Sequence, residues 1–474
     1  MSGGLLGCGT PGVRGVAGTA PAPNVLWTPP RESAAAPRPA LSLELPTDLA
    51  ERIARLTLTD VIDVALRNNT ATSAAWADAR AAAASYGAAK GQYYPTISID
   101  GSVTAIKTVP SAGRAAVKQQ FYGPTLNLSW LLFDFGGRSG SIGEAREALL
   151  AADWTHNATL QGVVLAVQGA YFQYLGTKAL LAAQQTTLKE AQINLQAAQQ
   201  RHQVGLATIA DELQAKTALS QAQLALEFTE GQLQSTRGAL ALSMGLPANV
   251  PYDIALPSDT TPPLGIMESV DTLIDRAVRE RPDLAAARAE ARAARARLSV
   301  ARSQALPSLS VGGNTGETYF ANSSNFGNSY SATLTLSIPL FSGWSQIYNA
   351  KSAAAAAEAA ERRAQGFEQR VVYEVFTAYY ALRTATQQVR TSADLLASAT
   401  QSEQVALGRY KAGAGSLLDL LTAQAALASA RAQAIQARFS WYIALAQLAH
   451  DAGILGLDGK SPLRLQTDTT GTNK

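Results

Sequence analysis

Two aspartates stand in matching sequence contexts, and their spacing is the clearest sign of chemistry in the chain. Asp211 ends the run Thr208-x-x-Asp211, and Asp419 ends the run Ser416-x-x-Asp419. A hydroxyl residue followed three positions later by an acid predicts a capping box at the start of a helix. A carboxylate there also suits the positive end of the helix dipole. If copies of these aspartates converged on an axis, they would attract cations and repel anions.

No other set of residues predicts catalysis. The sequence has no Gly-x-Ser-x-Gly motif, no phosphate-binding P-loop and no His-Glu-x-x-His zinc motif. His156, His202 and His450 are far apart, and a single cysteine cannot form a disulfide framework or a thiolate metal cluster. We therefore expect a protein that is not an enzyme and that holds neither a cofactor nor a metal.

The single cysteine ends the run Leu-Leu-Gly-Cys8, which resembles a bacterial lipobox, whose cysteine is lipidated after cleavage. Only four residues precede this run, fewer than the basic and apolar regions of a signal peptide need. Either the start of the sequence is mis-assigned or truncated, or Cys8 is an incidental thiol. An acyl chain would add about 0.8 kcal/mol of membrane affinity per buried CH₂. Residues 1–50 are rich in proline and are expected to be disordered.

The composition limits the classes of protein to which the chain could belong. Its 474 residues carry 39 Lys and Arg against 36 Asp and Glu, a balance that argues against a nucleic-acid binder. No run of 18 or more apolar residues is present, so no transmembrane helix is expected. Such a chain could enter a membrane only as a β-barrel. A soluble protein with very long helices is the alternative, because the sequence is rich in Ala, Gln and Leu.

The helices predicted in the first half are unusually long. Residues 139–203 contain no proline, and at 1.5 Å per residue they would extend about 100 Å. After a break at Val204-Gly205-Leu206, a second helix is predicted at 208–245. Near the start of the chain, a helix begins close to Leu58 with Thr59 as its N-cap and continues through Ala-rich sequence to residue 91.

The second half of the chain repeats the first. Arg201 and Gly205 have counterparts in Arg409 and Gly413. The number of residues between the two members of each pair is the same, and we call this number the offset. Other matching residues keep it, and upstream of the strands it becomes slightly larger because of small insertions or deletions. Each half predicts a helix, two strands, a very long helix, a turn and a further helix. The expected parts are a first repeat at 51–250, a linker at 251–267, a second repeat at 268–455 and a C-terminal tail at 456–474.

Four segments alternate apolar and polar residues with a period of two, as strands do. In the first of them, Ile97, Ile99 and Val103 alternate with Ser, Asp and Thr. Aromatic residues gather at both ends of these segments, which is typical of an outer-membrane barrel, and a soluble sheet with one buried face is the alternative. The strands are expected at about 94–105, 124–134, 307–320 and 330–341.

These four strands require more than one chain if they cross a bilayer. Strands of about ten residues are long enough to span, but four of them cannot close a barrel, and open edges are not tolerated in lipid. Two copies would supply eight strands, which are too few for a water-filled passage, whereas three copies would supply twelve. The pattern favours three or more chains without fixing the number.

The strand pairs, helical hairpins and duplication together resemble the TolC-type outer membrane efflux family (the outer membrane factors) over residues 58–453. Local motifs support the resemblance: an opening segment that ends at Asn69, a strand start at Ala305–Val311 and a hairpin tip from Arg409 to Ala423. The resemblance implies a mainly α-helical chain whose trimer forms a 12-stranded transmembrane barrel continuing into a helical periplasmic tunnel. A lipidated Cys8 would fit the family's lipoprotein branch.

The resemblance also implies roles for residues at the hairpin tips. Asp419 and Asp211 match aspartates that line the periplasmic entrance, and Tyr410 matches a tyrosine that holds the closed entrance by bonding the aspartate at position 211. Helix capping alone would explain both aspartates, and a packed aromatic at a helix end would explain Tyr410. The chain departs from the family at Thr422, where a second aspartate is expected, and at Gly415, where a gating arginine is expected.

The tips are also expected to contact a partner. Val204-Gly205-Leu206 resembles the family's adaptor-contacting tip, and Gly413 is the counterpart of Gly205 in the second hairpin. Both glycines fit the position after a helix where a positive φ is needed. A turn that packs its own apolar side chains is the alternative explanation of this tip.

We therefore predict a passive export channel of the cell outer membrane with a periplasmic extension. It would serve tripartite efflux or type I secretion as a homotrimer, together with a periplasmic adaptor and an inner-membrane pump of the RND or ABC class. Nothing in the sequence binds nucleotide, so the pump must supply the energy. The alternative is a periplasmic coiled-coil adaptor or structural protein, which the duplicated strand pairs disfavour. The sequence identifies neither the substrate nor the class of pump.

Overall fold

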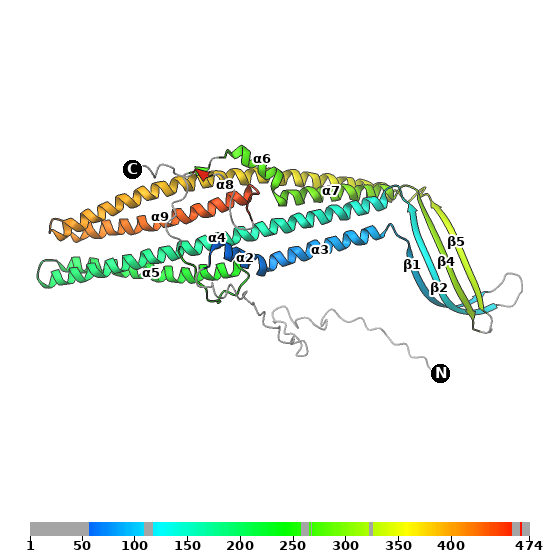
Figure 1. Ribbon diagram of the computed structural model, residues 1–474, viewed down its shortest axis with the longest axis horizontal. Coiled ribbons are helices and arrows are strands. Elements are labelled where there is room, and N and C mark those ends of the chain that lie inside the picture. The colour runs from blue at the N-terminus through cyan, green and yellow to red at the C-terminus, as the bar shows by residue number, and fades with distance from the viewer. Residues whose placement is uncertain are drawn as a thin grey trace, which may run out of the picture. The chain divides into compact units, whose positions relative to one another are not determined.

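Long helices lie side by side, and a four-stranded sheet continues from one end of them (Figure 1). The computed structural model describes residues 56–108, 117–256, 265–266, 268–321, 326–456 and 465–466. The expectations about Cys8, about residues 1–50 and about most of the C-terminal tail fall outside these residues. Among the described helices, none combines the length and the apolar character that a bilayer-spanning helix needs.

The chain is mainly helical, and each helix of the first half has a helix of equal length in the second half. The four lengths are 11, 22, 67 and 35 residues, and 67 residues extend about 100 Å. The helices are α2 (Leu58–Asn68), α3 (Thr70–Gly91), α4 (Gly137–Gln203), α5 (Ile209–Ser243), α6 (Val270–Glu280), α7 (Pro282–Ser303), α8 (Ser345–Lys411) and α9 (Leu417–Asp451).

The first predicted helix is in fact two helices, α2 and α3, which meet at Asn69. Asn69 has an extended backbone (φ −68°, ψ 126°), and its side-chain oxygen accepts a hydrogen bond from the N–H of Ala71. A short polar side chain that can cap a helix therefore ends one helix and starts the next. The N-cap of α2 is Thr57 and not Thr59, because Thr57 stands three residues before Asp60 and forms a capping box with it.

The four long strands form one antiparallel sheet in the order β1-β2-β4-β5. Within the described residues, β1 and β5 each have a neighbouring strand on one side only, so both edges of the sheet carry unpaired backbone groups. A separate ribbon pairs two short strands, β3 and β6. The strands are β1 (Thr96–Thr108), β2 (Val117–Phe133), β3 (Gly265–Ile266), β4 (Ser308–Phe320), β5 (Phe326–Ser337) and β6 (Leu465–Gln466).

Two prolines explain where the observed strands differ most from the predicted ones. β2 begins seven residues earlier than predicted, because Pro124 lies where the pairing of β2 with β4 is interrupted, between Tyr122 and Thr125. A proline, which has no N–H to donate, is tolerated at such an interruption. β5 starts at Phe326 and ends at Ser337, short of the predicted residue 341, because Pro339 cannot continue the ladder.

One face of the sheet is apolar and the other is polar. On the apolar face the register places Ile99 of β1 beside Leu126 of β2, and Leu334 lies on β5. On the polar face Asn127 Nδ2 donates a hydrogen bond of 2.6 Å to Asp100 Oδ2. Ile99 is 74% exposed and Leu334 is 65% exposed, so the described residues leave the apolar face uncovered.

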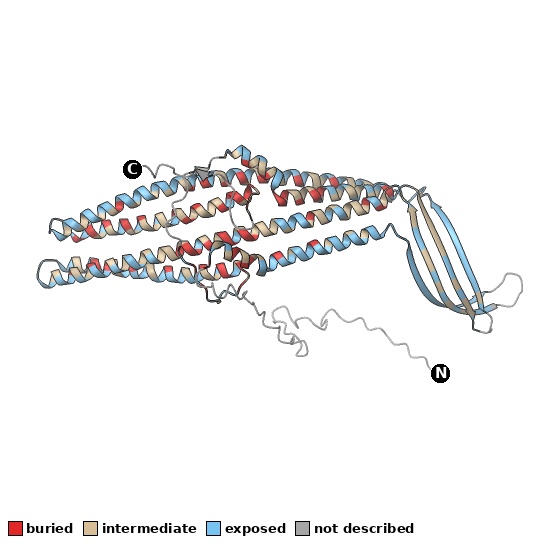
Figure 2. Cartoon of the chain, viewed as in Figure 1, coloured by how far each residue is buried: buried red, intermediate tan, exposed pale blue. Residues whose placement is uncertain are grey.

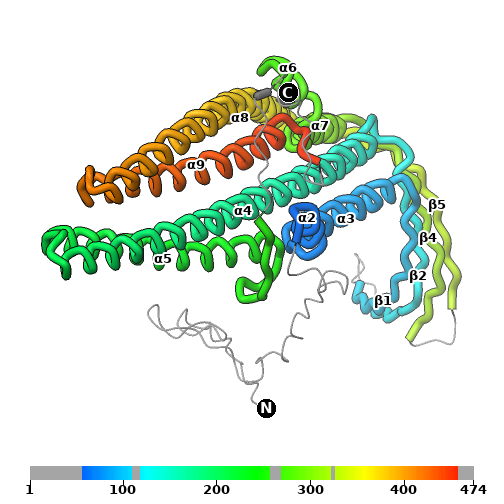
Figure 3. Tube along the Cα trace, turned by 60° about the vertical axis from the view of Figure 1, so that its left-hand side comes forward, coloured from blue at the N-terminus to red at the C-terminus, as the bar shows by residue number. Residues whose placement is uncertain are grey.

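The helices pack in two groups that follow one another along the molecule and share the long helices α4 and α8. Nearer the sheet, α3 packs on α4, α4 on α7 and α7 on α8. Away from the sheet, α5 packs on α4, α4 on α9 and α9 on α8, so the order across this part is α5, α4, α9, α8 (Figures 1 and 3). The two helical hairpins, α4/α5 and α8/α9, therefore have their tips at the same end of the molecule, opposite the sheet.

Buried side chains concentrate along the middle of the helical part, whereas the strands are largely exposed (Figure 2). Trp441 lies in this region with 1% exposure, and its Nε1 donates a hydrogen bond of 2.9 Å to Thr386 Oγ1. A buried indole N–H that finds a partner adds no desolvation penalty to the apolar area it buries. Other large, fully buried side chains are Ile62, Leu175, Leu240, Met244, Ile254, Leu273, Leu284, Leu382, Leu420 and Leu448.

Candidate functional site

The two hairpin tips share one backbone design. At the first tip Gly205 has φ +73°, its N–H donates to the carbonyl of His202, and the N–H of Leu206 donates to the carbonyl of Arg201. At the second tip Gly413 has φ +72° and ends α8 with the same pair of bonds, made to residues 410 and 409. This is the Schellman arrangement, which satisfies the last carbonyls of a helix and requires a left-handed residue. The predicted positive φ of both glycines is confirmed.

The first tip presents apolar side chains to solvent. Val204 is 68% exposed and Leu206 is 71% exposed, and Ile209 in the first turn of α5 is 56% exposed. In the second tip two exposed alanines, Ala412 and Ala414, take the places of Val204 and Leu206. Leu418, in the first turn of α9, is 56% exposed. Exposed apolar residues at the end of a helical hairpin are the kind of surface that receives the apolar face of a partner helix.

Both aspartates cap the helices that start at the tips. Asp211 Oδ2 accepts hydrogen bonds from the Thr208 N–H (2.9 Å) and the Thr208 hydroxyl (2.8 Å), and Thr208 Oγ1 accepts one from the Asp211 N–H. Ser416 and Asp419 exchange the corresponding bonds between backbone and side chain at 3.2 and 3.1 Å. The two predicted capping boxes are therefore present, and both carboxylates remain at the protein surface.

The caps predict how the tips respond to acid. Hydrogen bonds from Thr208 lower the pKa of Asp211, and hydrogen bonds from Ser416 lower the pKa of Asp419, below the ordinary value of 3.8. A carboxyl with a depressed folded-state pKa stabilises the fold above its unfolded pKa, and that stabilisation is lost as the pH falls through the folded value. We expect the amide NMR signals of Thr208 and Ser416 to titrate with midpoints below 3.8.

The control for this titration is Thr208→Ala, which removes the hydroxyl donor and keeps the backbone N–H. Its midpoint at position 211 should rise toward the ordinary value while that at position 419 stays unchanged. Wild-type midpoints at or above 3.8 would show that the capping boxes do not form in solution.

Tyr410 lies between the two tips. The guanidinium of Arg201, from the first hairpin, lies 4.7 Å from the centre of the Tyr410 ring, a cation–π contact. The same ring packs against a buried apolar cluster that includes Ala198 of α4 and Leu420 of α9. Within the described part of this single chain, the Tyr410 hydroxyl makes no hydrogen bond with Asp211.

Two arginines at the tips were not predicted as site residues. Arg201 stacks on Tyr410 and contributes to the lowered pKa of Asp211, after the hydrogen bonds from Thr208. Arg409 occupies the equivalent place at the second tip, where its Nη2 donates to the carbonyl of residue 414 and its charge contributes to the lowered pKa of Asp419. The signal was present, because each arginine stands four residues before the turn glycine.

Polar contacts join the hairpins behind the tips. Arg431 of α9 forms an ion pair of 3.1 Å with Glu190 of α4, and both side chains are about 30% exposed. Nearer the tips, Asn194 Nδ2 donates a hydrogen bond of 2.5 Å to Gln424 Oε1. These contacts fix the face of α4 that meets α9.

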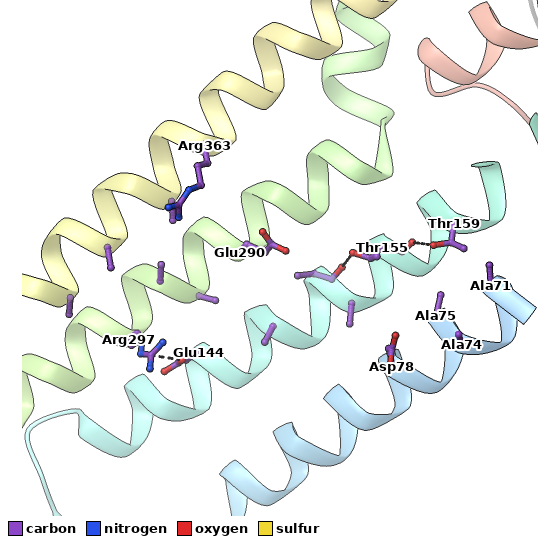
Figure 4. A pocket seen from close by; sticks show the side chains of 18 residues that line it. Ala71, Ala74, Ala75, Asp78, Glu144, Thr155, Thr159, Glu290, Arg297 and Arg363 are labelled. Carbon is purple, nitrogen blue, oxygen red and sulfur yellow. Dashed lines mark hydrogen bonds and ion pairs between the residues drawn. The ribbon is translucent and has the colours of Figure 1, made fainter. Parts of the chain in front are cut away.

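A long groove lies between α3, α4, α7 and α8 in the half of the molecule nearer the sheet (Figure 4). It has a volume of about 840 Å³ and is lined mostly by alanines. Its charged groups face it from different helices, and Glu144 and Arg297 form a long ion pair of 3.9 Å across it. Among the described residues no cluster of three or more His, Cys, Asp or Glu is placed to hold a metal ion. Small side chains with scattered charges form a smooth wall and not a specific binding pocket.

Comparisons with known proteins agree with this architecture. Residues 61–246 and 273–453 match the family model described as outer membrane efflux protein. Protein CyaE of Bordetella pertussis is 31% identical over 458 residues, covering 94% of each chain. TtgC of Pseudomonas putida, described as a probable efflux pump outer membrane protein, is 25% identical over 397 residues, covering 81% of this chain and 80% of TtgC.

A solved structure shares the fold at lower identity. The outer-membrane channel OprN superposes with a TM-score of 0.77 and 21% identity, covering 85% of this chain and 90% of OprN. The family model covers both halves of the chain, including both hairpins and all four long strands. The chain therefore belongs to the outer membrane efflux protein family, and it is a channel of the outer membrane.

Proposed function

We propose that three copies of this chain form one closed 12-stranded barrel and one 12-helix periplasmic tunnel, which together serve as a passive export duct. The observation that carries this proposal is the four-stranded sheet, which has two unpaired edges and an exposed apolar face within the described residues. In lipid, the only stable form of such a sheet is a closed barrel. Family membership favours this channel over a periplasmic adaptor.

The equal helix lengths support the proposal that the chain is two copies of one structural unit. The long hairpins start at Gly137 and Ser345, and the short helices that precede the strands start at Leu58 and Val270. The starts of the long hairpins are separated by the offset that relates most of the two halves of the sequence. The starts of the short helices are separated by the slightly larger offset found upstream of the strands. Six such units in three chains would each supply two strands, which gives twelve.

The polar face of the sheet would line the passage. Asp100, Asn127 and Ser98 share this face, and Asp100 accepts hydrogen bonds from both neighbours. A wall of small polar residues gives weak and broad selectivity, as a duct requires. The apolar face would then meet lipid, with aromatic pairs such as Phe133–Phe135 and Tyr122–Tyr319 toward its two ends.

The hairpin tips would form the periplasmic entrance and the adaptor contact. In a ring of three chains, copies of Asp419 would face a common axis and create a constriction that favours cations. Val204, Gly205 and Leu206, together with Gly413, would receive the adaptor. An inner-membrane pump of the RND or ABC class would supply energy and substrate. Asp211 and Tyr410 would hold the closed state of this entrance.

Substituting Asp419 by asparagine tests the entrance. Asp419→Asn keeps an oxygen that can accept the cap hydrogen bonds and removes the charge, so we expect block of single-channel current by Mg²⁺ to weaken roughly tenfold after screening by salt. The measurement is planar-bilayer conductance of the purified protein at several Mg²⁺ concentrations. The matched control is Asp60→Asn, which changes the capping box of α2 far from the tips. Equal block in both variants would reduce Asp419 to a helix cap, and no conductance in the wild type would contradict the duct itself.

A further inference from the structure

Two lysines lie opposite each other at the end of the sheet that is remote from the helices. β1 follows α3 and β2 leads into α4, so the strand ends at Thr108 and Val117 point away from the helical part (Figure 1). There Lys107 of β1 is paired in register with Lys118 of β2, and both side chains are exposed. Residues paired in this way have Cβ atoms about 5 Å apart, and like charges directly opposite each other destabilise a sheet. An anion held between the two ammonium groups would relieve this repulsion.

Both lysines lie on the apolar face of the sheet. Lys107 is four residues beyond Val103 on β1. Lys118 is four residues beyond Tyr122 on β2, and Tyr122 is paired in register with Val103. Because side chains an even number of residues apart on a strand share one face, the lysines continue the face that Val103 and Tyr122 occupy. Val103 is 85% exposed, and the ring of Tyr122 stacks on that of Tyr319 in β4. In the proposed barrel this face is the one that meets lipid.

The position of the lysines along the strands corresponds to the headgroups of the outer leaflet. The stretch of β2 from Trp130 to Tyr122 is about 27 Å long, and a strand tilt of about 40° reduces this to a height of about 21 Å. That height is close to the apolar band of about 25 Å that two aromatic girdles enclose in outer-membrane barrels. Lys118 is about 10 Å higher than Tyr122 by the same tilt. Its ammonium group therefore lies outside the hydrocarbon, at the level of charged headgroups.

No carboxylate of the four long strands is placed to neutralise the two lysines. The charged residues of these strands are Asp100, Lys107, Lys118 and Glu317. Asp100 lies on the polar face, where it is hydrogen-bonded. Glu317 accepts a hydrogen bond of 2.5 Å from the hydroxyl of Tyr319, which is paired in register with Tyr122. Glu317 is thus on the helical side of Tyr122, about 20 Å along the strands from Lys118.

The other segments at this end bring no negative charge either. The sequences of the two connections, 109–116 and 322–325, contain no Asp or Glu. β5 has no charged residue, and it is the strand that would lie beside β1 of the next copy in the closed barrel. The two lysines therefore leave an excess of positive charge on this part of the face, which is complementary to an anionic group.

We propose that Lys107 and Lys118 together bind the phosphate group of an anionic lipid in the outer leaflet. An ammonium group binds phosphate oxygens through charge-assisted hydrogen bonds, and two such groups on adjacent strands can hold one phosphate between them. The acyl chains of the same lipid then lie along the apolar face, beside Val103 and Tyr122. A free phosphate ion lacks these apolar contacts, so the surface suits a lipid better than a soluble anion. The proposal rests on the proposed barrel and gives its outer side a lipid site of defined chemistry.

Native mass spectrometry of the detergent-extracted, full-length protein tests this site. The probe is bisphosphorylated lipid A, and the comparison lipid is phosphatidylcholine, which carries no net charge. We expect the wild type to prefer lipid A and to bind it with a stoichiometry of one tight site per chain. The double variant Lys107→Gln, Lys118→Gln should bind lipid A about thirtyfold more weakly, because each lysine near an anionic lipid contributes about fivefold. Excess inorganic phosphate should not displace the lipid.

The matched control combines Lys189→Gln with Lys411→Gln, which removes the same charge from exposed positions on α4 and α8. It should bind lipid A as the wild type does. A particle of several chains in which the two double variants bind lipid A equally would overturn the lipid site and leave the duct standing. The same holds if the wild type does not prefer lipid A to phosphatidylcholine, or if inorganic phosphate displaces the lipid. A particle of one chain would overturn both the site and the duct.

Discussion

Replacing Arg281 with methionine should lower the free energy of unfolding by about 3 kcal/mol at pH 7. The Arg281 side chain is 5% exposed, at the joint between α6 and α7, where it forms ion pairs of 2.6 Å with Asp283 and 2.8 Å with Glu374 of α8. Without the guanidinium, Asp283 loses both of its side-chain hydrogen bonds with Arg281, and Glu374 keeps only its ion pair of 2.7 Å with Arg370. A partly buried carboxylate without its cation is more costly than the loss of a surface pair. Urea unfolding followed by circular dichroism measures the change.

Asp283 determines how the loss of stability in Arg281→Met depends on pH. Burial alone would raise its pKa, but hydrogen bonding and charge from Arg281 hold the pKa of Asp283 below the ordinary value of 3.8. In the wild type its stabilising effect is therefore full above pH ~4 and is lost only in stronger acid. In the variant burial remains and Arg281 does not, so the carboxyl takes up a proton at higher pH. The deficit should be largest at neutral pH and should shrink as the pH falls.

The matched control is Arg295→Met, which breaks an ion pair between the same two helices, α7 and α8. Arg295 and Glu361 are paired at the surface, with side chains 63% and 33% exposed. Exposed pairs of this kind contribute little. The urea midpoint of this variant should stay close to that of the wild type. Equal losses in the two variants would show that the Arg281 network is not buried as the structure describes.

Replacing Gly123 with alanine should largely prevent assembly of the sheet. An ideal Cβ at Gly123 would lie 1.8 Å from the carbonyl oxygen of Glu317 and 2.9 Å from its carbonyl carbon. Both atoms belong to the backbone of β4, so no side-chain rotation can relieve the clash, and β2 and β4 must separate. We expect a cost of about 3 kcal/mol, which lowers the ratio of folded to unfolded protein roughly 150-fold. The measurement is the amount of folded protein in the outer-membrane fraction.

Gly101→Ala is the control for this substitution. Gly101 lies in β1, paired with Pro124 beside Gly123, and no heavy atom of the described chain lies within 4 Å of its ideal Cβ. Alanine should be accepted there without loss of folded protein. The comparison separates the clash from any general intolerance of alanine in these strands. Wild-type levels of Gly123→Ala in the outer membrane would contradict the pairing of β2 with β4.

Features with a local cause were predictable from the sequence. The turn glycines 205 and 413 and the caps at Asp211 and Asp419 follow from short motifs, because the groups that interact are three to five residues apart. The length of the long helices followed from an absence of proline. The break at Asn69 was missed, although an asparagine is a common N-cap, because Ala-rich sequence on its far side continued the helical pattern.

Contacts between distant segments could not be predicted in the same way. Arg201 meets the ring of Tyr410, and Glu190 meets Arg431, although the partners in each pair belong to different halves of the chain. No periodicity encodes which helices become neighbours. The ion pairs of Arg281 could not be predicted for a further reason. The equivalent residue of the first half is Asn69, which caps a helix, so the duplication gave no sign of a charged cluster there.

The mass of the membrane-extracted protein in detergent, measured by light scattering with the bound detergent subtracted, tests the central claim most directly. Each chain supplies four strands with two open edges, so a stable membrane form requires chains to share one barrel. We expect a particle of three chains, close to three times 49.6 kDa, that stays in solution only with detergent. A single chain that remains in solution without detergent would contradict the shared barrel and the export duct built on it.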